Sequence, residues 1–145
     1  MYKKLFKSLF YEPVSSSTKS LVILLARIIF GFLFLSHGIT KLHTYVHVPE
    51  MFPDPIGLGS TVSLWMVLFA EILCTTGFIL GALFRLCLTP MIFTMCIALF
   101  VIHADDPLDT KELSMMYLAI FALLYITGPG RYSIDGIFKR FYQKR

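Results

Sequence analysis

The chain has 145 residues, of which 57% are hydrophobic and 15% are charged, and its formal net charge is +4. A small soluble domain exposes much of its surface, so it needs more charged residues than this, about 25% on average. With a mean hydropathy of +0.74, the composition excludes a soluble globular domain, a disordered chain and a nucleic-acid binder.

Ionisable residues divide most of the chain into apolar stretches. The first stretch, 21–41, contains Arg27 and His37 before it ends at Lys41, and the second, 61–83, contains only Glu71. The stretches 86–104 and 113–128 contain no Asp, Glu, Lys or Arg. A transmembrane helix needs about 20 mostly apolar residues, and these runs lack the alternation of a barrel strand. We therefore predict an all-α protein, an integral membrane bundle of four helices.

Charge placement gives the domain organisation and the orientation. The transmembrane domain is predicted at 21–128, after a cytoplasmic or interfacial segment at 1–20 and before a basic amphipathic tail at 129–145. Of the 13 Lys and Arg, four precede the first span, one lies between the second and third spans, and five lie in the tail. The two opposite loops hold six acidic residues. Because basic residues favour the cytoplasmic side, both termini are predicted to face the cytoplasm.

Both ends of the chain have a pattern typical of helices on a membrane surface. Residues 2–11 mix lysines with leucine and phenylalanine, which suits an interfacial helix. In the tail, Ser133 is placed to cap a helix, with Asp135 near the positive end of that helix. We expect the tail to contact the membrane, with a solvated basic tail as the alternative.

Residues at the predicted interfaces are interpreted as anchors. The Gly-Pro-Gly run at 128–130 ends the fourth helix. Arg131 and Tyr132 then lie at headgroup depth, where both residue types are favoured, and Arg85 is interpreted in the same way. At the opposite surface, Lys41 is expected to extend its ammonium group to the headgroups.

Polar residues within the spans are costly in lipid and usually face the bundle interior. A helix turns about 100° per residue, so the first span carries one stripe, with His37 at its edge: Arg27, Gly31, Phe34, Gly38 and Lys41. The matching stripe of the second span is Leu64, Val67, Glu71, Thr75, Phe78 and Ala82. The third span shares Thr89, Cys96 and His103 on one face, and the fourth shares Tyr117, Phe121, Leu124 and Gly128.

The depth of each polar residue follows from a rise of about 1.5 Å per residue. His37, His103 and Glu71 are predicted to meet in the outer half of the bundle, and Arg27 is long enough to reach towards Glu71 from the inner half. A buried glutamate is costly unless it is paired. Two interpretations remain open: an Arg27–Glu71 ion pair that only fixes helix register, and a functional polar pocket that joins Glu71 with Arg27, His37 or His103.

Haem and metal sites are less favoured. His37 and His103 lie at similar depth, as axial ligands of a haem would, but no second histidine pair supports this interpretation. His43 and His47 lie four residues apart in the outer loop without a third ligand, so no metal site is predicted. The sequence has no phosphate loop or dinucleotide fingerprint.

Three segments together resemble the DoxX family. The segment RIIFGFLFLSHGITKL (residues 27–42) is similar to the first-helix signature of the family, and AEILCTTGFILG (residues 70–81), followed by Arg85, is similar to its second helix. The run GPGRYSID (residues 128–135) resembles the motif after the last helix. The resemblance covers residues 21–137 and implies a four-helix, multi-pass protein of the bacterial inner membrane.

The family takes its name from a small subunit associated with a thiosulfate:quinone oxidoreductase, and other members are linked to membrane oxidoreductase complexes and redox homeostasis. Motif matching carries over site candidates without an assigned catalytic role for each: Arg27, His37, Gly38, Lys41, Glu71, Arg85 and Arg131. The loop at 44–60 departs from the family pattern, so no substrate is inferred from it.

The leading hypothesis is a subunit or accessory of a quinone-linked redox system, with sulfur compounds as one candidate substrate class. Glu71 and His37 would handle protons, and Arg27 would keep Glu71 ionised or bind a quinone carbonyl. Electrons would come from a membrane or peripheral redox partner protein or through the quinone itself. The alternatives are a small proton-coupled transporter or channel and a structural assembly partner. Small residues on the helix faces allow a homo-oligomer without requiring one.

Overall fold

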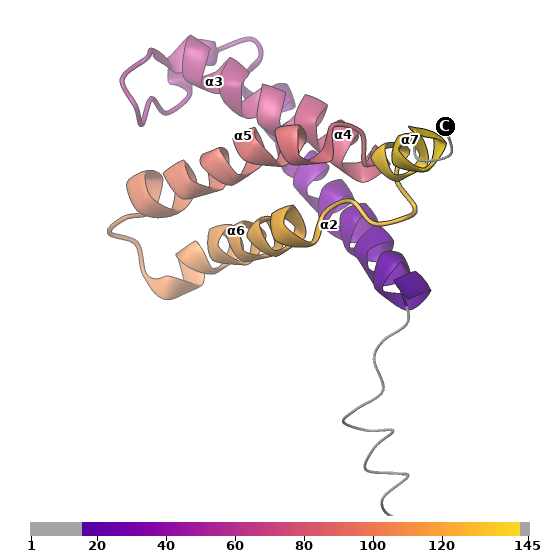
Figure 1. Ribbon diagram of the computed structural model, residues 1–145. Coiled ribbons are helices and arrows are strands. Elements are labelled where there is room, and N and C mark those ends of the chain that lie inside the picture. The colour runs from indigo at the N-terminus through magenta and orange to yellow at the C-terminus, as the bar shows by residue number, and fades with distance from the viewer. Residues whose placement is uncertain (1–15, 143–145) are drawn as a thin grey trace, which may run out of the picture.

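The computed structural model describes residues 16–142, and all regular structure in that part of the chain is helical (Figure 1). The first crossing is α2, Ser16–Tyr45, and the short 3₁₀ helix η1, Pro49–Met51, follows it. The second crossing joins α3, Ser60–Leu68, the π-helix η2, Phe69–Cys74, and α4, Thr75–Leu80. The third joins α5, Phe84–Ile97, to the π-helix η3, Ala98–Ile102, and the last elements are α6, Leu108–Thr127, and α7, Ile134–Tyr142.

Four helical segments of the described chain are long and apolar enough to cross a membrane: Ser16–Tyr45, Ser60–Leu80, Phe84–Ile102 and Leu108–Thr127. The predicted all-α bundle of four transmembrane helices is therefore confirmed, and the protein is a multi-pass membrane protein. The first helix begins at Ser16, earlier than the predicted boundary at 21. The surface helix predicted at 2–11 lies outside the described residues.

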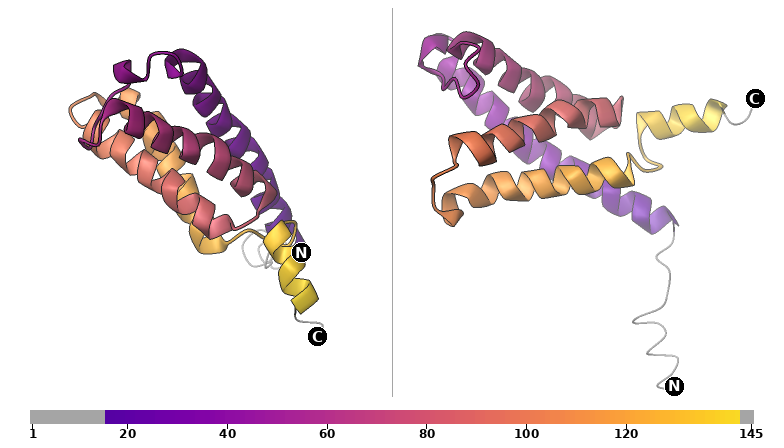
Figure 2. Two further views of the ribbon diagram at one scale, coloured as in Figure 1. Left: turned by 90° about the horizontal axis from the view of Figure 1, so that it is seen from above. Right: turned by 60° about the vertical axis from the view of Figure 1, so that its left-hand side comes forward.

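The chain crosses the bundle in an up-and-down order (Figures 1 and 2). The start of α2, the turn between α4 and α5, and α7 lie at one end, which we call the basic end. The loop at 46–59 and the turn between η3 and α6 lie at the other, the acidic end. Helix α5 packs against α4 and α6, and α2 packs along η2 and α4. Helix α3 diverges from α5 towards the acidic end, so the bundle is splayed there (Figure 1).

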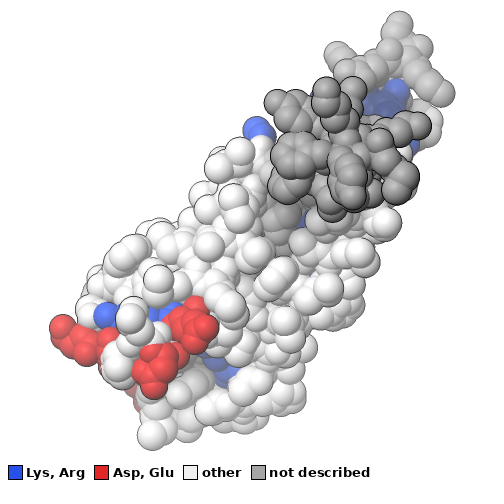
Figure 3. Space-filling model, turned by 90° about the horizontal axis from the view of Figure 1, so that it is seen from below, with Lys and Arg blue, Asp and Glu red and all other residues white. Residues whose placement is uncertain are grey.

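Charged side chains gather at the two ends and leave a broad uncharged belt between them (Figure 3). The described basic residues of the basic end are Lys19, Arg85, Arg131, Lys139 and Arg140. The acidic end carries Glu50, Asp54, Asp105, Asp106, Asp109 and Glu112. This distribution matches a bundle whose middle faces hydrocarbon. Which end faces the cytoplasm stays a prediction.

Aromatic rings fill the centre of the bundle, on the stripes expected from helical periodicity. Phe34 of α2 meets Phe121 of α6 with ring centroids 5.0 Å apart. Phe78 of α4 stacks on Phe84 of α5 at 5.4 Å. The buried residues of the first crossing include Arg27, Gly31, Phe34 and Gly38, and those of the second include Leu64, Glu71, Thr75 and Phe78.

The third crossing packs through a different face from the polar one expected. Its buried residues are Phe84, Leu88, Met91 and Met95, whereas Thr89 is exposed. The hydroxyl of Thr89 donates to the Arg85 carbonyl oxygen at 3.0 Å. A threonine can satisfy its polar group within its own helix in this way, so its presence does not mark an inward face.

Candidate functional site

A cavity of about 890 Å³ lies towards the acidic end and is lined on two sides by residues of α3 and α5. Helices α2 and α6 contribute to its wall, and the loop after η1 contributes Phe52 and Pro53. Most of the lining side chains are apolar. The ionisable ones are His37, Lys41, Tyr45, Glu71, His103 and Tyr117. An apolar cavity with a few polar groups is the usual form of a small-molecule site.

Glu71 reaches the cavity wall from the π-helix η2, in the middle of the second crossing. The altered backbone is visible in Thr75, whose hydroxyl donates to the carbonyl oxygen of Ala70, five residues earlier, at 3.1 Å. Single π-helical turns are rare and are frequent at functional sites. Hydropathy does not predict such a turn, because the residues around Glu71 are apolar in either helix type.

The missing side chain of Gly38 lets α2 approach this π-helix closely. A Cβ atom at Gly38 would lie 2.8 Å from the Cβ of Glu71 and 3.1 Å from its backbone carbonyl carbon. Real Cβ atoms do not tolerate the first distance, so only glycine fits here without a shift. Gly38, one of the site candidates from motif matching, therefore positions Glu71 and is not itself part of the cavity lining.

Lys41 is the ionic partner of Glu71. The Lys41 Nζ atom lies 2.5 Å from Oε1 and 2.6 Å from Oε2 of Glu71. Glu71 is 1% exposed, whereas the side chain of Lys41 is 32% exposed. Lys41 therefore does not extend to the headgroups as the sequence suggested, because a buried carboxylate on the facing helix binds its ammonium group. The pair adds no net charge to the cavity.

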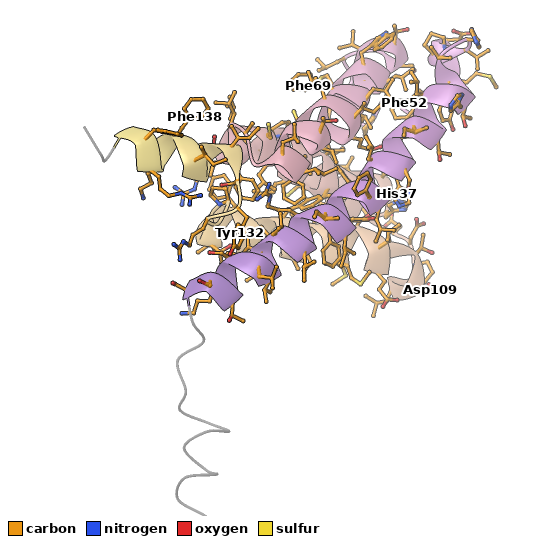
Figure 4. All side chains as sticks on the ribbon, turned by 90° about the vertical axis from the view of Figure 1, so that its right-hand side faces the viewer. His37, Phe52, Phe69, Asp109, Tyr132 and Phe138 are labelled. Atoms are coloured by element: carbon orange, nitrogen blue, oxygen red, sulfur yellow. The ribbon has the colours of Figure 1, made fainter. Side chains whose placement is uncertain are left out.

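Two histidines also line the cavity. His37 lies on α2, on the half that leads towards Phe52 and Asp109 and away from Tyr132 and Phe138 (Figure 4). Its ring meets Tyr117 edge-on, with centroids 5.9 Å apart. His103, at the end of η3, contacts Asp106 through Nδ1 at 2.7 Å. His37, Glu71 and His103, expected at similar depth, all line the cavity.

Arg27 lies at the opposite end of the bundle and does not pair with Glu71. Its guanidinium donates to four backbone carbonyl oxygens: Phe78 at 3.1 Å, Ile79 at 2.5 Å, and Pro129 and Tyr132 at 2.9 Å each. The predicted Arg27–Glu71 pair is therefore wrong, as is the placement of Arg27 in the pocket. The physical reason is that the loop after α6 and the end of α4 offer carbonyls closer to Arg27 than the carboxylate is.

The other candidate residues lie at the basic end. The guanidinium of Arg85 stands over the ring of Tyr125 at 5.7 Å. Arg131 donates to the hydroxyls of Ser16 and Ser17 at 3.5 and 3.4 Å, and Tyr132 is exposed. None of these three side chains lines the cavity. Their role as membrane anchors stays a prediction.

Ligands for a metal ion do not gather in the part of the chain that the structure describes. No group of three or more His, Cys, Asp or Glu residues lies close enough to hold an ion there. His43 and His47 are both exposed in and after the last turn of α2. The polar groups that line the cavity are instead an ammonium, a carboxylate and two imidazoles, which can form hydrogen bonds and exchange protons.

The loop at 46–59 contributes residues that sequence reasoning did not select. Phe52 is buried and packs edge-on against Tyr45, with ring centroids 5.2 Å apart. Pro53, Pro55 and Ile56 also line the cavity. The sequence did hold one indication of this role. Phe52 is an aromatic residue among prolines in a loop at a membrane surface, where most loops are polar.

A family model described as DoxX matches residues 22–104, which span α2 to the end of the third crossing. The match covers more than half of the chain, so the chain belongs to the DoxX family. It includes every cavity residue of the first three crossings. No curated protein and no solved structure matches the chain.

Proposed function

We propose that this DoxX protein binds a lipid-soluble quinone in its membrane cavity, as a subunit or accessory of a membrane redox system. The observation that carries the proposal is the ion pair between Lys41 and the buried Glu71 in the wall of a largely apolar cavity. A ligand suited to this site has a long apolar body and a small neutral polar head. A quinone has this form, and its carbonyl oxygens accept hydrogen bonds.

The cavity walls support a ligand that arrives from the bilayer. Trp65 and Phe69 on the second crossing and Phe93 on α5 are lining residues that are also largely exposed. Because these side chains both line the cavity and are exposed, the cavity opens to the flank of the bundle, where lipid surrounds it. An isoprenoid tail fits this opening, while the ring reaches the polar groups farther in.

The polar residues support binding and proton exchange at the ring. A lysine ammonium has three donors, and two of them point to the oxygens of Glu71. The third is available for a quinone carbonyl. Reduction of a quinone to a quinol takes up two electrons and two protons, and Glu71 and His37 are the proposed proton carriers. The electrons come from a redox partner protein, because the proposal assigns no electron carrier to this chain.

The family resemblance extends the proposal to location and partners. We place the protein in the bacterial inner membrane with both termini in the cytoplasm, in keeping with the basic end described above. Oxidation of sulfur compounds is the proposed source of electrons. Small residues on the helix faces permit association with a membrane partner or with a second copy.

Titration of the purified protein with a long-chain ubiquinone or menaquinone analogue tests the proposal. We expect saturable binding that weakens at least tenfold in Glu71→Gln and is unchanged in the matched variant Glu112→Gln, because Glu112 is exposed outside the cavity. Linear, non-saturable uptake by both variants and by the unmodified protein would rule out a specific site.

A transport assay separates this proposal from the transporter alternative. In proteoliposomes with an imposed proton gradient, we expect no solute flux that depends on Glu71. Proton-coupled flux that disappears in Glu71→Gln would instead favour a transporter. A structural assembly partner is favoured if crosslinking captures one stable partner and neutralisation of both Lys41 and Glu71 leaves the function of the complex intact.

A further inference from the structure

The basic end of the molecule carries a second surface that the quinone proposal does not use. Helix α7 exposes a row of large apolar side chains to the surroundings: Ile137, Phe138 and Phe141, of which the two phenylalanines are 70% and 71% exposed. Tyr132, just before the helix, is also half exposed. Lys139 and Arg140 lie beside this row. The bundle does not cover this face, since α7 leaves it beyond the end of α6 (Figure 2).

Hydrogen bonds hold the start of α7 at the level where the transmembrane helices end. The carboxylate of Asp135 accepts from the backbone N–H groups of Leu83 and Phe84, at 3.0 and 2.9 Å. Phe84 is the first residue of the third crossing. The Asp135 N–H in turn donates to the Gly81 carbonyl oxygen at 3.0 Å. Asp135 therefore caps α5, not its own helix, and fixes α7 beside the membrane boundary.

The cap of α7 itself is formed by Ser133, as the sequence predicted. The Ser133 hydroxyl accepts from the Gly136 N–H at 3.0 Å. Arg140 then folds back, and its guanidinium donates to the carbonyl oxygens of Arg131 and Gly136, at 2.6 and 3.2 Å. Helix α7 is thus an ordered element joined to the bundle, and its exposed apolar row has a defined position.

The charge around α7 identifies what covers this row. The described basic residues of this end are Lys19, Arg85, Arg131, Lys139 and Arg140, and the carboxylate of Asp135 on α7 is already bonded to backbone N–H groups. An aromatic row beside basic residues, next to the ends of transmembrane helices, is the pattern of a helix in contact with an anionic leaflet. A protein partner of this surface would need a matching acidic groove, whereas an anionic leaflet meets basic and aromatic side chains at the ends of transmembrane helices directly.

We propose that α7 and Tyr132 form an anionic-phospholipid site at the basic end of the bundle. Phe138 and Phe141 insert among the acyl chains near the headgroups, and Lys139 and Arg131 bind the phosphate groups. The site is independent of the cavity, which lies at the opposite end.

Fluorescence quenching by brominated lipid tests this proposal in the full chain. The chain has one tryptophan, so the variant Trp65→Phe with Phe138→Trp places a single reporter on α7. In liposomes of phosphatidylcholine with brominated phosphatidylglycerol, we expect strong quenching of this reporter. Brominated phosphatidylcholine at the same fraction should quench it less, because it is not enriched around α7.

Neutralisation of the basic residues distinguishes binding of anionic lipid from mere insertion of α7 into the bilayer. We expect Lys139→Gln to weaken the enrichment of the brominated anionic lipid by about fivefold, and Lys111→Gln at the acidic end to leave it unchanged. A water-exposed reporter without quenching would overturn the proposal. So would equal quenching by the two lipids, or a reporter buried only against a second copy of the chain or another protein.

Discussion

Two buried charges in this bundle are neutralised in different ways, and the difference separates a structural region from the proposed ligand site. At the basic end, Arg27 donates to four backbone carbonyls and has no carboxylate partner within residues 16–142. At the other end, Glu71 binds the ammonium of Lys41 in the wall of a cavity. The first charge is enclosed by the chain itself, while the second lies where a ligand can reach its partner.

The surroundings of Arg27 explain why a lone cation is stable there. Phe78 and Ile79 lie in the last turn of α4, where the carbonyls point out of the helix and carry the negative end of its dipole. Pro129 and Tyr132 belong to the loop after α6, whose carbonyls would otherwise be unpaired in an apolar environment. Arg27 joins these three segments, so its charge is part of the fold.

Replacement of Arg27 should have the largest effect. We expect Arg27→Leu to lower the free energy of unfolding by about 3 kcal/mol, since four charge-assisted hydrogen bonds to backbone carbonyls are lost at once. Thermal denaturation in detergent measures this loss. The control is Arg85→Leu, which removes one ring contact worth less than about 1 kcal/mol. An Arg27→Leu protein as stable as Arg85→Leu would show that the carbonyl cluster does not depend on the cation.

Gly38→Ala should disturb the region around Glu71 almost as strongly. The added methyl group would overlap the Cβ of Glu71, and overpacking of this kind costs about 2 kcal/mol. The variant should also weaken quinone binding, because η2 must move. Ser36→Ala, on the exposed side of the same helix, serves as the matched control. Unchanged stability and binding in Gly38→Ala would mean that the two helices are not in close contact.

The Lys41–Glu71 pair should behave as a coupled unit. We expect Lys41→Met to cost about 1.5 kcal/mol because it leaves a buried carboxylate unpaired, and Glu71→Gln to cost less. The double variant should be more stable than the sum of the two losses predicts, with a coupling of about 1 kcal/mol. Denaturation of all four proteins gives this value. Strictly additive losses would place the two side chains out of contact.

Acid should destabilise the loop at 46–59 beside the cavity, and this effect should be the smallest of those predicted here. Hydrogen bonds from the Ser63 hydroxyl and from the Gly59 N–H hold the pKa of Asp54 below its usual range. A lowered pKa means that the carboxylate stabilises this loop above its ordinary pKa and loses that effect as the pH falls through the lowered value.

Ser63→Ala should therefore raise the pKa of Asp54 towards its ordinary value, and Ser60→Ala should not. Carboxyl chemical shifts recorded against pH measure both. Hydrogen exchange at the Leu58 and Gly59 amides should increase in the same acidic range, because the Leu58 and Gly59 N–H groups donate to Asp54. A pKa of Asp54 that does not move in Ser63→Ala would contradict this account of the loop.

Helical periodicity predicted the fold and part of the site because burial repeats with the turn of the helix. The stripe of Arg27, Phe34 and Gly38 was correct for this reason. Periodicity did not predict the buried face of the third crossing, where Thr89 satisfies its hydroxyl within its own helix and stays exposed. Polarity alone does not tell an inward residue from one that bonds to its own backbone.

Pairing across the bundle was harder to predict than burial. Depth along the helices suggested Arg27 as the partner of Glu71 and left Lys41 at the headgroups, and the actual pairing depends on features that the sequence does not reveal. One is the return of the 128–132 loop, which supplies carbonyls to Arg27. The other is the π-helical turn that presents Glu71 to α2. Both are properties of the backbone, which follow from the packed bundle and not from local composition.

The central claim is that the Lys41–Glu71 pair serves ligand binding, whereas the charge of Arg27 serves the fold. Quinone binding to the double variant Lys41→Met, Glu71→Gln tests this claim most directly. This double variant retains no buried charge in the cavity, so it should remain folded with a denaturation temperature close to that of the unmodified protein. The account predicts that its affinity for the quinone analogue falls at least tenfold. Equal affinity in the folded double variant would contradict it.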